Sequence, residues 1–523
     1  MNNTRDLVVR ALVVSAVLAA TSACGSTVSI GSSAGPAAGN ELGLGTTGST
    51  QGASGAGSSG GASGAASATG IGAAGAAGSG ANPSGPGATG ADGGSTSAGS
   101  LSGPGVTATT ITLGVVYATN SSAADQAMGA NGLTTGNDLA EIRILVNDIN
   151  RHGGVAGRRL VVLPYGEDAT SAQPYSVTAQ QMCAFMTQDH RVLAVLVASG
   201  FGDAKACLNR AGTAQFDGSL IGLSDSDGKS QIDFATAAMN IDRSMLAAVR
   251  AWTIGNWYAP WNTVAGAPAT GGQFKMGVLT IDDPVLNHAV DKVLLPALAR
   301  AGHRPPAAQD IIRLHEPGSA GDDGSVLAEI QNAVLKFRQD NVDHVVIMDS
   351  NGSATLFFAN DAYSQRYFPR LGGGSGNAFQ ALLETGNVQQ QSMAGAVAAG
   401  WTPVLDLPYG SEHKFESPSA AHCRELMKAG GQTFTNANAE AYALGYCDAL
   451  TVIARALDAA PTMTANGLAQ GAESIGRSMM SALTVGLDLG PGHHDAAGAF
   501  YADVYDNSCT CFTYRGARQL VSR

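Results

Sequence analysis

The sequence predicts an α/β protein with two doubly wound, Rossmann-like lobes joined by a hinge and preceded by a disordered linker. Short β-branched apolar runs alternate with amphipathic helical segments between residues 107 and 523, and this alternation restarts near residue 275. Residues 25–105, by contrast, lack aromatic side chains and carry only the charges of Glu41 and Asp92. Alternating strands and helices favour a parallel sheet covered on both faces, and two such series indicate two lobes with a cleft between them.

The length and charge of the chain limit the number of its domains and the kinds of partner that it can have. Its 523 residues leave room for two to four domains at roughly 150 residues each. The formal net charge of −12 argues against a nucleic-acid partner, since proteins that bind nucleic acids normally present a basic face. We therefore expect a globular protein that does not bind nucleic acid.

Residues 24–106 form the predicted linker. The stretch is almost entirely Gly, Ser, Ala, Thr and Pro, so it buries too little apolar surface to offset the entropy of ordering it. A flexible chain of about 80 residues has a typical end-to-end distance of roughly 50 Å. The folded part is then expected to span residues 107–523.

The N-terminus has the features of an export signal. Two arginines precede the apolar run 11–20, which has the length of a signal-peptide core and is too short to span a bilayer. The small residues that follow lead to Cys24 and resemble a bacterial lipobox, although Thr21 stands where lipoboxes usually carry Leu. The resemblance implies a signal peptide at 1–23 and a lipid anchor on Cys24. The alternative is an ordinary secretory signal with Cys24 incidental.

The remaining six cysteines indicate disulfides, because an even number of cysteines in an exported chain is typical of them. Six cysteines allow 15 pairings, so their number alone does not decide among them. The equal separation of 24 residues favours two pairs and leaves a third: Cys183 with Cys207, Cys423 with Cys447, and Cys509 with Cys511. A redox or metal role for the Cys-Thr-Cys sequence is the alternative for the last pair.

The expected elements follow the chain in two series. In lobe 1, about 107–257, we expect strands at 111–117, 159–165, 192–197 and 219–224, and helices at 137–151, 175–186, 203–211 and 242–254. In lobe 2, about 274–400, we expect strands at 275–280, 310–314 and 344–348, and helices at 284–301 and 326–339. Later segments are expected to cross between the lobes.

Three stretches resemble a known family. "NDLAEIRILVNDINRHGGVAGRRLVVLPYGED" contains an Ile-Asn pair near a helix end, a Gly-Gly-Val-Ala-Gly-Arg turn and a strand that ends in Glu167 and Asp168. It resembles the first helix–turn–strand of type I periplasmic binding proteins, in particular the branched-chain amino acid and amide receptors of ABC importers. "VLTIDDPVLNHA" and "AYALGYCDALTVIARALDAA" are similar to the start of lobe 2 and to a late helix of that family. The resemblance spans about Thr110 to Val521, and many members carry a disulfide where Cys183 and Cys207 stand.

This resemblance implies an extracytoplasmic solute-binding lipoprotein that serves an ABC permease. A small polar solute, an amino acid or an amide-like compound, would bind between the lobes and stabilise their closure about the hinge. The partners expected are the solute, the permease and, through Cys24, the lipid bilayer. The alternative is a ligand-sensing receptor domain for a membrane signalling partner. No cofactor, metal or enzymatic activity is expected.

The expected ligand contacts stand at the ends of strands. The family's carboxylate clamp uses hydroxyl residues there, which implies contacts from Ser199 and Ser224 in lobe 1. Gly200 and Thr119, which stand at ends of strands of the same lobe, are further candidates for ligand contact. In lobe 2, Asp349 and then Asp282 are the candidates for pairing with an ammonium group. The structural alternative for each is a helix cap or a turn former, since Ser and Asp are common in both.

Other patterns do not support a catalytic or metal site. "GLSDSDGKS" has the wrong glycine spacing for a phosphate-binding loop and lacks the glutamate that a calcium loop needs. "GGGSGN" (372–377) is not a nucleophile elbow and is expected to be a flexible turn. The tract 252–261 holds three of the four tryptophans, which favours either a larger or aromatic ligand or a surface loop. Trp401 is expected either to line the cleft or to pack in the core or hinge.

Overall fold

The computed structural model describes residues 102–127, 129–130, 132–133, 135–199, 204–219, 232–262, 274–348 and 352–521. The predicted signal peptide, Cys24 and almost all of the linker lie outside these residues, as do Gly200, Ser224 and Asp349. Within the described ranges, no helix combines the length and the apolar character needed to cross a membrane.

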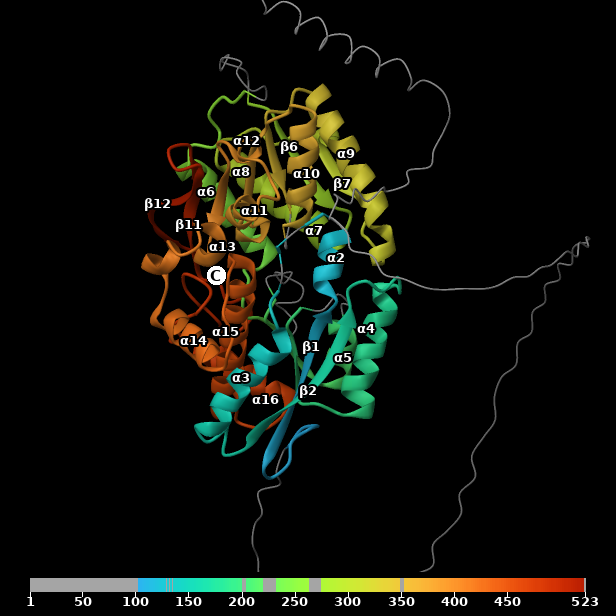
Figure 1. The fold of residues 1–523 in the computed structure, drawn as a ribbon, viewed down its shortest axis with the longest axis vertical. Coiled ribbons are helices and arrows are strands. Elements are labelled where there is room, and N and C mark those ends of the chain that lie inside the picture. The colour runs from blue at the N-terminus through green and yellow to red at the C-terminus, as the bar shows by residue number, and fades with distance from the viewer. Residues whose placement is uncertain are drawn as a thin grey trace, which may run out of the picture. The chain divides into compact units, whose positions relative to one another are not determined.

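The first sheet has five parallel strands in the order β2-β1-β3-β4-β5. The strands are β1 (Thr110–Thr119), β2 (Arg159–Asp168), β3 (Ala194–Val197), β4 (Ala214–Asp217) and β5 (Asp233–Ala235). The helices between them are α2 (Ser121–Ala127), α3 (Asp138–Arg151), α4 (Tyr175–Ala184), which continues as the π-helix Phe185–Asp189, and α5 (Lys205–Ala211). Figure 1 shows α3 on one side of this sheet and α4 and α5 on the other, the doubly wound arrangement that the sequence predicts.

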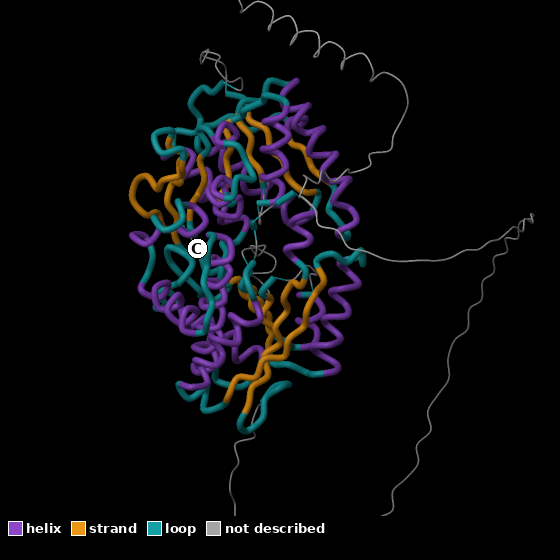
Figure 2. Tube along the Cα trace, viewed as in Figure 1, coloured by secondary structure: helices purple, strands orange, loops and turns teal. Residues whose placement is uncertain are grey.

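The second sheet has seven strands in the order β12-β11-β10-β9-β8-β6-β7. They are β6 (Met276–Ile281), β7 (Ile311–Leu314), β8 (His344–Ile347), β9 (Arg370–Gly374), β10 (Val397–Gly400), β11 (Ala499–Asp506) and β12 (Cys511–Leu520). The strands β6 to β10 are parallel to one another, whereas β11 and β12 form an antiparallel hairpin on the β10 edge. Both sheets are visible as groups of orange strands in Figure 2.

The remaining helices cover the second sheet or return to the first. Between β5 and β10 they are α6 (Ile241–Ile254), α7 (Pro284–His288), the π-helix Ala289–Leu294, α8 (Leu295–Arg300), α9 (Asp323–Gln339), α10 (Ser353–Ser364), α11 (Phe379–Glu384) and α12 (Gln390–Met393). After β10 they are α13 (Pro403–Asp406), α14 (Pro418–Ala429), α15 (Ala437–Ala459) and α16 (Ala465–Ile475). Short 3₁₀ turns lie at Ala308–Asp310, Ala320–Asp322, Ser375–Asn377 and Glu412–Phe415.

Some helices pack on a different sheet from the strands that precede them in the chain. The helix α6, expected in lobe 1, packs on the second sheet, where Trp252 lies in one buried cluster with residues of β10 and β11. In the other direction, the long helix α15 packs against α3 and contributes Tyr446 and Leu450 to the core of the first sheet. The chain therefore passes between the two sheets before α6, after β10 and again between α16 and β11.

The glycine-rich sequence 370–374 forms the strand β9, so the prediction of a flexible turn is wrong for its glycines. All five residues of β9 are buried. A Cβ atom on Gly372 would stand 3.0 Å from both Trp252 and Trp257, and one on Gly374 would stand 2.7 Å from Trp401. The strand has glycines because indole rings occupy the space that side chains would fill.

Three of the four tryptophans, Trp252, Trp257 and Trp401, are therefore core residues of the second sheet, whereas Trp261 is partly buried. Trp252 and Trp257 are fully buried with ring centroids 4.8 Å apart, and their indole N–H groups donate to Val397 O and Leu371 O. Trp401 is buried in the same cluster. Neither a ligand nor a surface loop explains Trp252 and Trp257, since burial with a satisfied N–H is the ordinary state of a core indole.

The first sheet contains the strand β4, which the sequence did not predict. The expected strand 219–224 lies almost entirely outside the described residues, and the strand in this part of the first sheet is β4. Its sequence, AQFD, is less apolar than SLIGLS (219–224), the strand that the sequence predicts. All four residues of β4 are nevertheless buried between β3 and β5. Its last residue, Asp217, takes the strand-end position that the sequence assigned to Ser224.

All three predicted disulfides are present. Cys183 pairs with Cys207, Cys423 with Cys447, and Cys509 with Cys511. The Cys423–Cys447 bridge joins α14 to α15, and Cys183–Cys207 joins α4 to α5. The redox or metal interpretation of Cys509 and Cys511 is therefore not needed.

We expect loss of the Cys423–Cys447 bridge by double substitution to alanine to lower the free energy of unfolding by about 3 kcal/mol, because the bridge closes a loop of about 25 residues in the unfolded chain. The matched control removes Cys509–Cys511, whose much shorter loop predicts about half that loss. Denaturant unfolding of both variants under oxidising conditions measures the difference. Equal losses would contradict the loop-entropy explanation.

We expect Gly374→Ala to lower the free energy of unfolding by about 1–3 kcal/mol, since its methyl group would overlap Trp401 in a packed core. The control is Gly324→Ala in α9, where a Cβ atom meets nothing within 4 Å. The control is expected to be neutral or to stabilise the helix by up to about 1 kcal/mol. Thermal unfolding of the two variants tests this contrast, and similar effects at both glycines would refute the packing argument.

Candidate functional site

Polar groups gather where β1 and β3 end and α3 begins. The backbone N–H of Ala118 donates to Ser199 Oγ at 2.8 Å, and the Ser199 hydroxyl donates in turn to Asp138 Oδ2. Ser199 and Asp138 are both buried. The side chain of Ser199 thus joins the ends of two parallel strands to the first residue of α3, at the edge where ligands bind in doubly wound sheets.

The first turn of α3 carries two buried carboxyl groups. Asn137 caps the helix by accepting from Ala140 N, and Glu141 Oε1 accepts from Asn137 N at 3.1 Å. Asp138 and Glu141 are 4% and 1% exposed. Negative side chains are favourable at a helix N-terminus, where the unpaired N–H groups carry positive partial charge. This explains why the helix starts here but not why its acids are buried.

The helix α15 places two tyrosines against these acids. The hydroxyl of Tyr446 lies beside the carboxyl group of Asp138, and Tyr446 is fully buried. Burial and the charge of Asp138 together raise the pKa of Tyr446 and that of the neighbouring Tyr442 above the ordinary value. The negative charge of Asp125, on α2, also acts on Tyr442. We call Asp125, Asp138, Glu141, Tyr442 and Tyr446 the acid–tyrosine cluster.

Burial makes the three acids of this cluster hard to ionise. It raises the pKa of Glu141 to about 7 and that of Asp125 to about 6. It also raises the pKa of Asp138, against the lowering effect of the hydrogen bond from Ser199. Among the described residues, no lysine, arginine or histidine forms an ion pair with any of the three. The cluster is therefore an uncompensated negative site when its acids are ionised.

The structure brings only part of the predicted ligand set together. Ser199 belongs to the edge just described, whereas Thr119 is half-buried and donates to Glu167 O at 3.1 Å. Asp282 follows β6 in the second sheet, is exposed and accepts from Asn287 Nδ2. The other three candidates lie outside the described residues, so the ligand-binding role of all six stays a prediction.

Sequence reasoning missed the acids and tyrosines of the cluster. The local pattern places Asp138 and Glu141 in an amphipathic helix, and the family resemblance places Tyr442 and Tyr446 in a late helix. A signal was present in Asn-Asp-x-x-Glu at the start of that helix, because it places two carboxyl groups in the first turn, next to a strand end. Their burial depends on α15, about 300 residues later in the chain, which the local pattern could not reveal.

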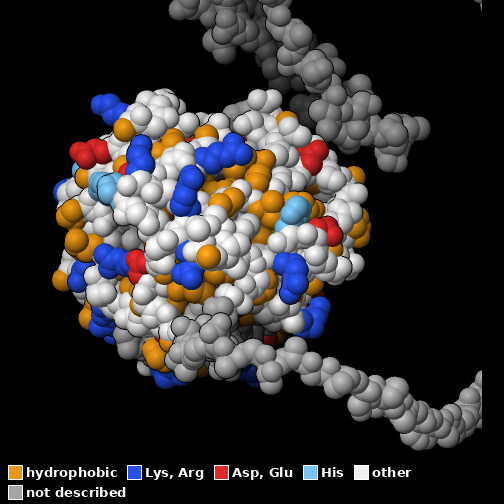
Figure 3. All heavy atoms as spheres, turned by 90° about the horizontal axis from the view of Figure 1, so that it is seen from below, with side chains coloured by type: hydrophobic (Ala, Val, Ile, Leu, Met, Phe, Trp, Pro, Cys, Tyr) orange, Lys and Arg blue, Asp and Glu red, His pale blue; other side chains and the backbone are white. Residues whose placement is uncertain are grey.

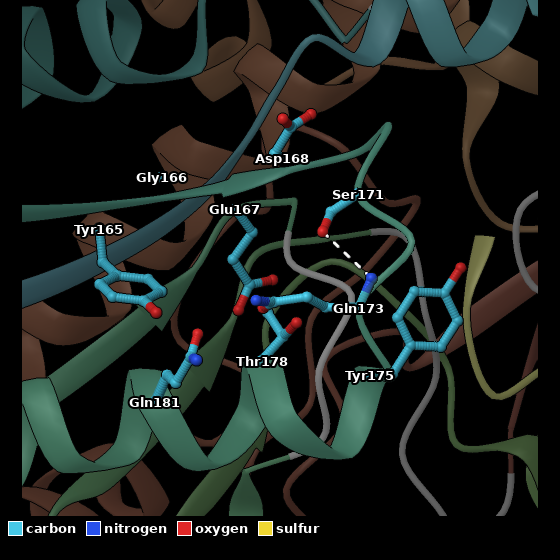
Figure 4. A pocket seen from close by; sticks show the side chains of 9 residues that line it. All are labelled: Tyr165, Gly166, Glu167, Asp168, Ser171, Gln173, Tyr175, Thr178 and Gln181. Carbon is cyan, nitrogen blue, oxygen red and sulfur yellow. Dashed lines mark hydrogen bonds between the residues drawn. The ribbon is translucent and has the colours of Figure 1, made fainter. Parts of the chain in front are cut away.

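A hollow of about 170 Å³ lies beside this edge, between the end of β2 and α4. Figure 4 shows the side chains of Glu167 and Gln173 turned toward one another inside it, and Gln173 N donates to Ser171 Oγ at 3.2 Å. Tyr175, at its margin, donates from its backbone N–H to Gly318 O, a residue that precedes α9. The hollow is polar and contacts the second lobe at its rim.

The second sheet holds its own buried acid at the corresponding edge. Asp406 Oδ2 accepts from Ser375 Oγ, Thr402 N and Tyr514 Oη at 2.7–2.9 Å. Burial raises the pKa of Asp406 to about 7. Burial, together with the charge of Asp406, raises the pKa of Asp503 well above its ordinary value. This arrangement ties the ends of β9 and β10 to β12 and leaves the acid little access to solvent, which is typical of a structural role.

One group of side chains has the spacing of a metal site. Ligand atoms of Glu412, His413 and Glu416 lie within 4.8 Å of one another. However, the guanidinium group of Arg424 already donates to both oxygens of Glu416 and to Glu440. A fixed positive charge at this position opposes cation binding, so the group is better explained as an ion-pair network between the 3₁₀ turn, α14 and α15.

The lower face of the molecule does not repeat the acidity of the cluster. Figure 3 views this face and shows more Lys and Arg side chains than Asp and Glu side chains on it, set among hydrophobic and uncharged groups. The net charge of −12 is therefore not gathered on this face.

We expect Glu141→Gln to change the pH dependence of stability in the ligand-free protein. Since folding raises the pKa of Glu141 from 4.5 to about 7, its effect on stability becomes unfavourable as the pH rises through that interval. The melting temperature of the variant, relative to the parent, should therefore rise between about pH 5 and about pH 8. The exposed Glu425, changed to Gln, is the control and should show no such trend. A pH-independent difference for Glu141→Gln would contradict the assignment.

Comparison of the sequence with family models and with curated proteins finds no match. Comparison of the structure finds solved proteins of similar fold. A possible leucine/isoleucine/valine-binding protein from Rhodopirellula baltica SH 1 has a TM-score of 0.52 and 15% identity, over 79% of this chain and 97% of that one. A solute-binding protein of an ABC transporter from R. palustris, in complex with 4-hydroxybenzoate, has a TM-score of 0.53 and 13% identity, over 79% and 97%.

A third similar structure is a fatty acid ABC transporter substrate-binding protein from Thermomonospora curvata, with a TM-score of 0.50 and 18% identity over 80% of this chain and 93% of that one. Identities this low establish likeness of fold. They confirm the predicted fold class: the chain has the two-lobed α/β fold of type I periplasmic binding proteins, the fold of ABC transporter substrate-binding proteins.

Proposed function

We propose that this protein is an extracytoplasmic solute-binding lipoprotein of an ABC importer and is not an enzyme. The observation that carries the proposal is the gathering of Ser199, Asp138 and the cluster tyrosines at the carboxyl ends of β1 and β3. Ligands bind at this edge in doubly wound sheets. The similarity in fold to substrate-binding proteins supports the same conclusion.

The proposed ligand contacts come from both lobes. From the first lobe they are Ser199, Gly200, Ser224 and Thr119, and from the second they are Asp349 and Asp282. A solute that touches both sets stabilises the closed arrangement through contacts that the open arrangement lacks. Closure about the hinge would then present the loaded protein to the permease.

The membrane link is proposed to run through Cys24 and the segment 24–106. A diacylated cysteine would hold one end of the chain in the bilayer, and a flexible linker would let the two lobes reach roughly 50 Å from it. This arrangement keeps the binding protein near its permease on the extracytoplasmic face. It also accounts for a long Gly- and Ser-rich stretch directly after a cysteine.

The identity of the solute does not follow from the fold. The similar proteins carry names that refer to branched-chain amino acids, to fatty acids and to 4-hydroxybenzoate, which differ in charge and size. The solute must therefore be inferred from the residues of this chain's own site.

We expect a thermal-shift screen of the mature chain, with Cys24→Ser, to identify one class of small polar solutes among amino acids, amides, amines and carboxylic acids. A ligand at a hundredfold excess over its Kd stabilises the native state by about 2.7 kcal/mol. Ser199→Ala should weaken binding at least about tenfold, because it removes a buried hydrogen bond at the site.

The control for this experiment is Ser364→Ala at the exposed end of α10, where the hydroxyl bonds only to the helix backbone. The control should bind the solute as the parent does. A folded, ligand-free protein that responds to no solute class would overturn the proposed function.

A further inference from the structure

The three carboxyl groups of the acid–tyrosine cluster form no ion pair with a cation among the described residues. Asp138 and Glu141 are buried, and Asp125 is close enough to raise the pKa of Tyr442, as Asp138 does. The groups that change the pKa of the three acids are burial, neutral hydrogen-bond donors and a neighbouring acid, with no basic side chain among them. Buried carboxylates are normally paired with a cation or a metal, and a cation bound here would favour the ionised form of these acids.

Glu141 has an acceptor that nothing fills. Its Oε1 accepts from Asn137 N, but no group of the described residues donates to its Oε2, although the residue is 1% exposed. A buried acceptor without a donor costs about 1–3 kcal/mol. A primary ammonium group has three N–H donors and no acceptor, and could serve Glu141 and Asp138 together.

The same geometry disfavours a carboxylate ligand at Ser199. The hydroxyl hydrogen of Ser199 already points to Asp138, and its oxygen already accepts from Ala118 N. A ligand carboxylate would have to take that hydrogen and lie next to Asp138, where two like charges repel. The hydrogen bonds of Ser199 therefore favour a cationic group over a carboxylate at this position.

Two tyrosine rings lie beside the carboxyl groups of this cluster. The ring centroids of Tyr442 and Tyr446 lie 6.3 Å apart on one face of α15. Tyrosine faces attract a cation electrostatically, by about 0.5–2 kcal/mol depending on how far it is desolvated. Acids with an open acceptor, next to two tyrosines at a strand-end edge, make a site whose chemistry suits a cation.

We propose that the acid–tyrosine cluster is the subsite for a primary ammonium group of a solute that carries no carboxylate, such as an aliphatic monoamine or diamine. This inference rests on the proposed function, since it names the class of solute that the binding protein captures. Binding inserts the ammonium between Glu141 and Asp138, with Tyr442 and Tyr446 beside it. The rest of the solute then extends toward the second lobe.

The test is calorimetric titration of the mature chain with four probes: putrescine, isoamylamine, leucine and isovalerate. The two amines are expected to bind, and leucine and isovalerate to bind at least about tenfold more weakly. Tetramethylammonium, which has charge but no N–H donors, should also bind at least about tenfold more weakly than the amines, because it leaves Glu141 Oε2 without a donor.

The second part of the experiment uses variants of the acid–tyrosine cluster. Glu141→Gln and Asp138→Asn should each weaken amine binding at least about tenfold, while the matched controls Glu425→Gln on the surface of α14 and Asp148→Asn on α3 should leave it unchanged. Each variant is first checked by circular dichroism and thermal melting. Should Asp138→Asn fail to fold, the charge-preserving Glu141→Asp, with expected partial retention of affinity, takes its place.

The outcomes separate the two proposals. Tight binding of leucine or isovalerate without binding of amines would overturn the ammonium subsite and leave the solute-binding function intact. Amine binding that Glu141→Gln and Asp138→Asn do not alter would also overturn the subsite. No binding of any probe or of any other solute class by the folded, ligand-free protein would overturn both.

Discussion

The hydrogen bond from Ser199 to Asp138 is the contact around which the polar edge of the first sheet is organised. It joins the end of β3 to the start of α3, and the bond from Ala118 N to the same serine adds the end of β1. Without it, Asp138 would be a buried carboxyl group with one fewer donor, at a cost of about 1–3 kcal/mol. The α15 tyrosines then complete an interior that is polar and negative.

The second lobe depends on a different constraint: large side chains from outside β9 fill the volume that the glycines of this strand leave empty. The glycines of β9 leave room for Trp252, Trp257 and Trp401, and the indole N–H groups of the first two bond to main-chain carbonyls of neighbouring strands. Large rings over a bare strand bury much apolar area with few rotatable bonds. This packing gives the sheet a rigid side against which the rest of the lobe is ordered.

Local patterns predicted most elements up to β8, the two-lobed α/β architecture and the pairing of the cysteines. They did not predict β4 and β5, or the strands β9, β11 and β12. They failed where the structure of a segment depends on residues that are far away in the sequence. β9 is a strand because tryptophans from elsewhere cover its glycines, and AQFD is a strand because β3 and β5 flank it. The acids of α3 became a candidate site only through Tyr442 and Tyr446, far along the chain, so no window of sequence could show them together.

The segment after β1 gives the two lobes a shared component. It leaves the first sheet at Thr119 and forms α2, and its residue Ala130 is then 4% exposed within the core cluster of the second sheet. Any separation of the lobes must therefore either stretch this segment or remove Ala130 from the core cluster of the second sheet. The described part of this segment therefore couples a change in the spacing of the two sheets to the loss of a small apolar contact.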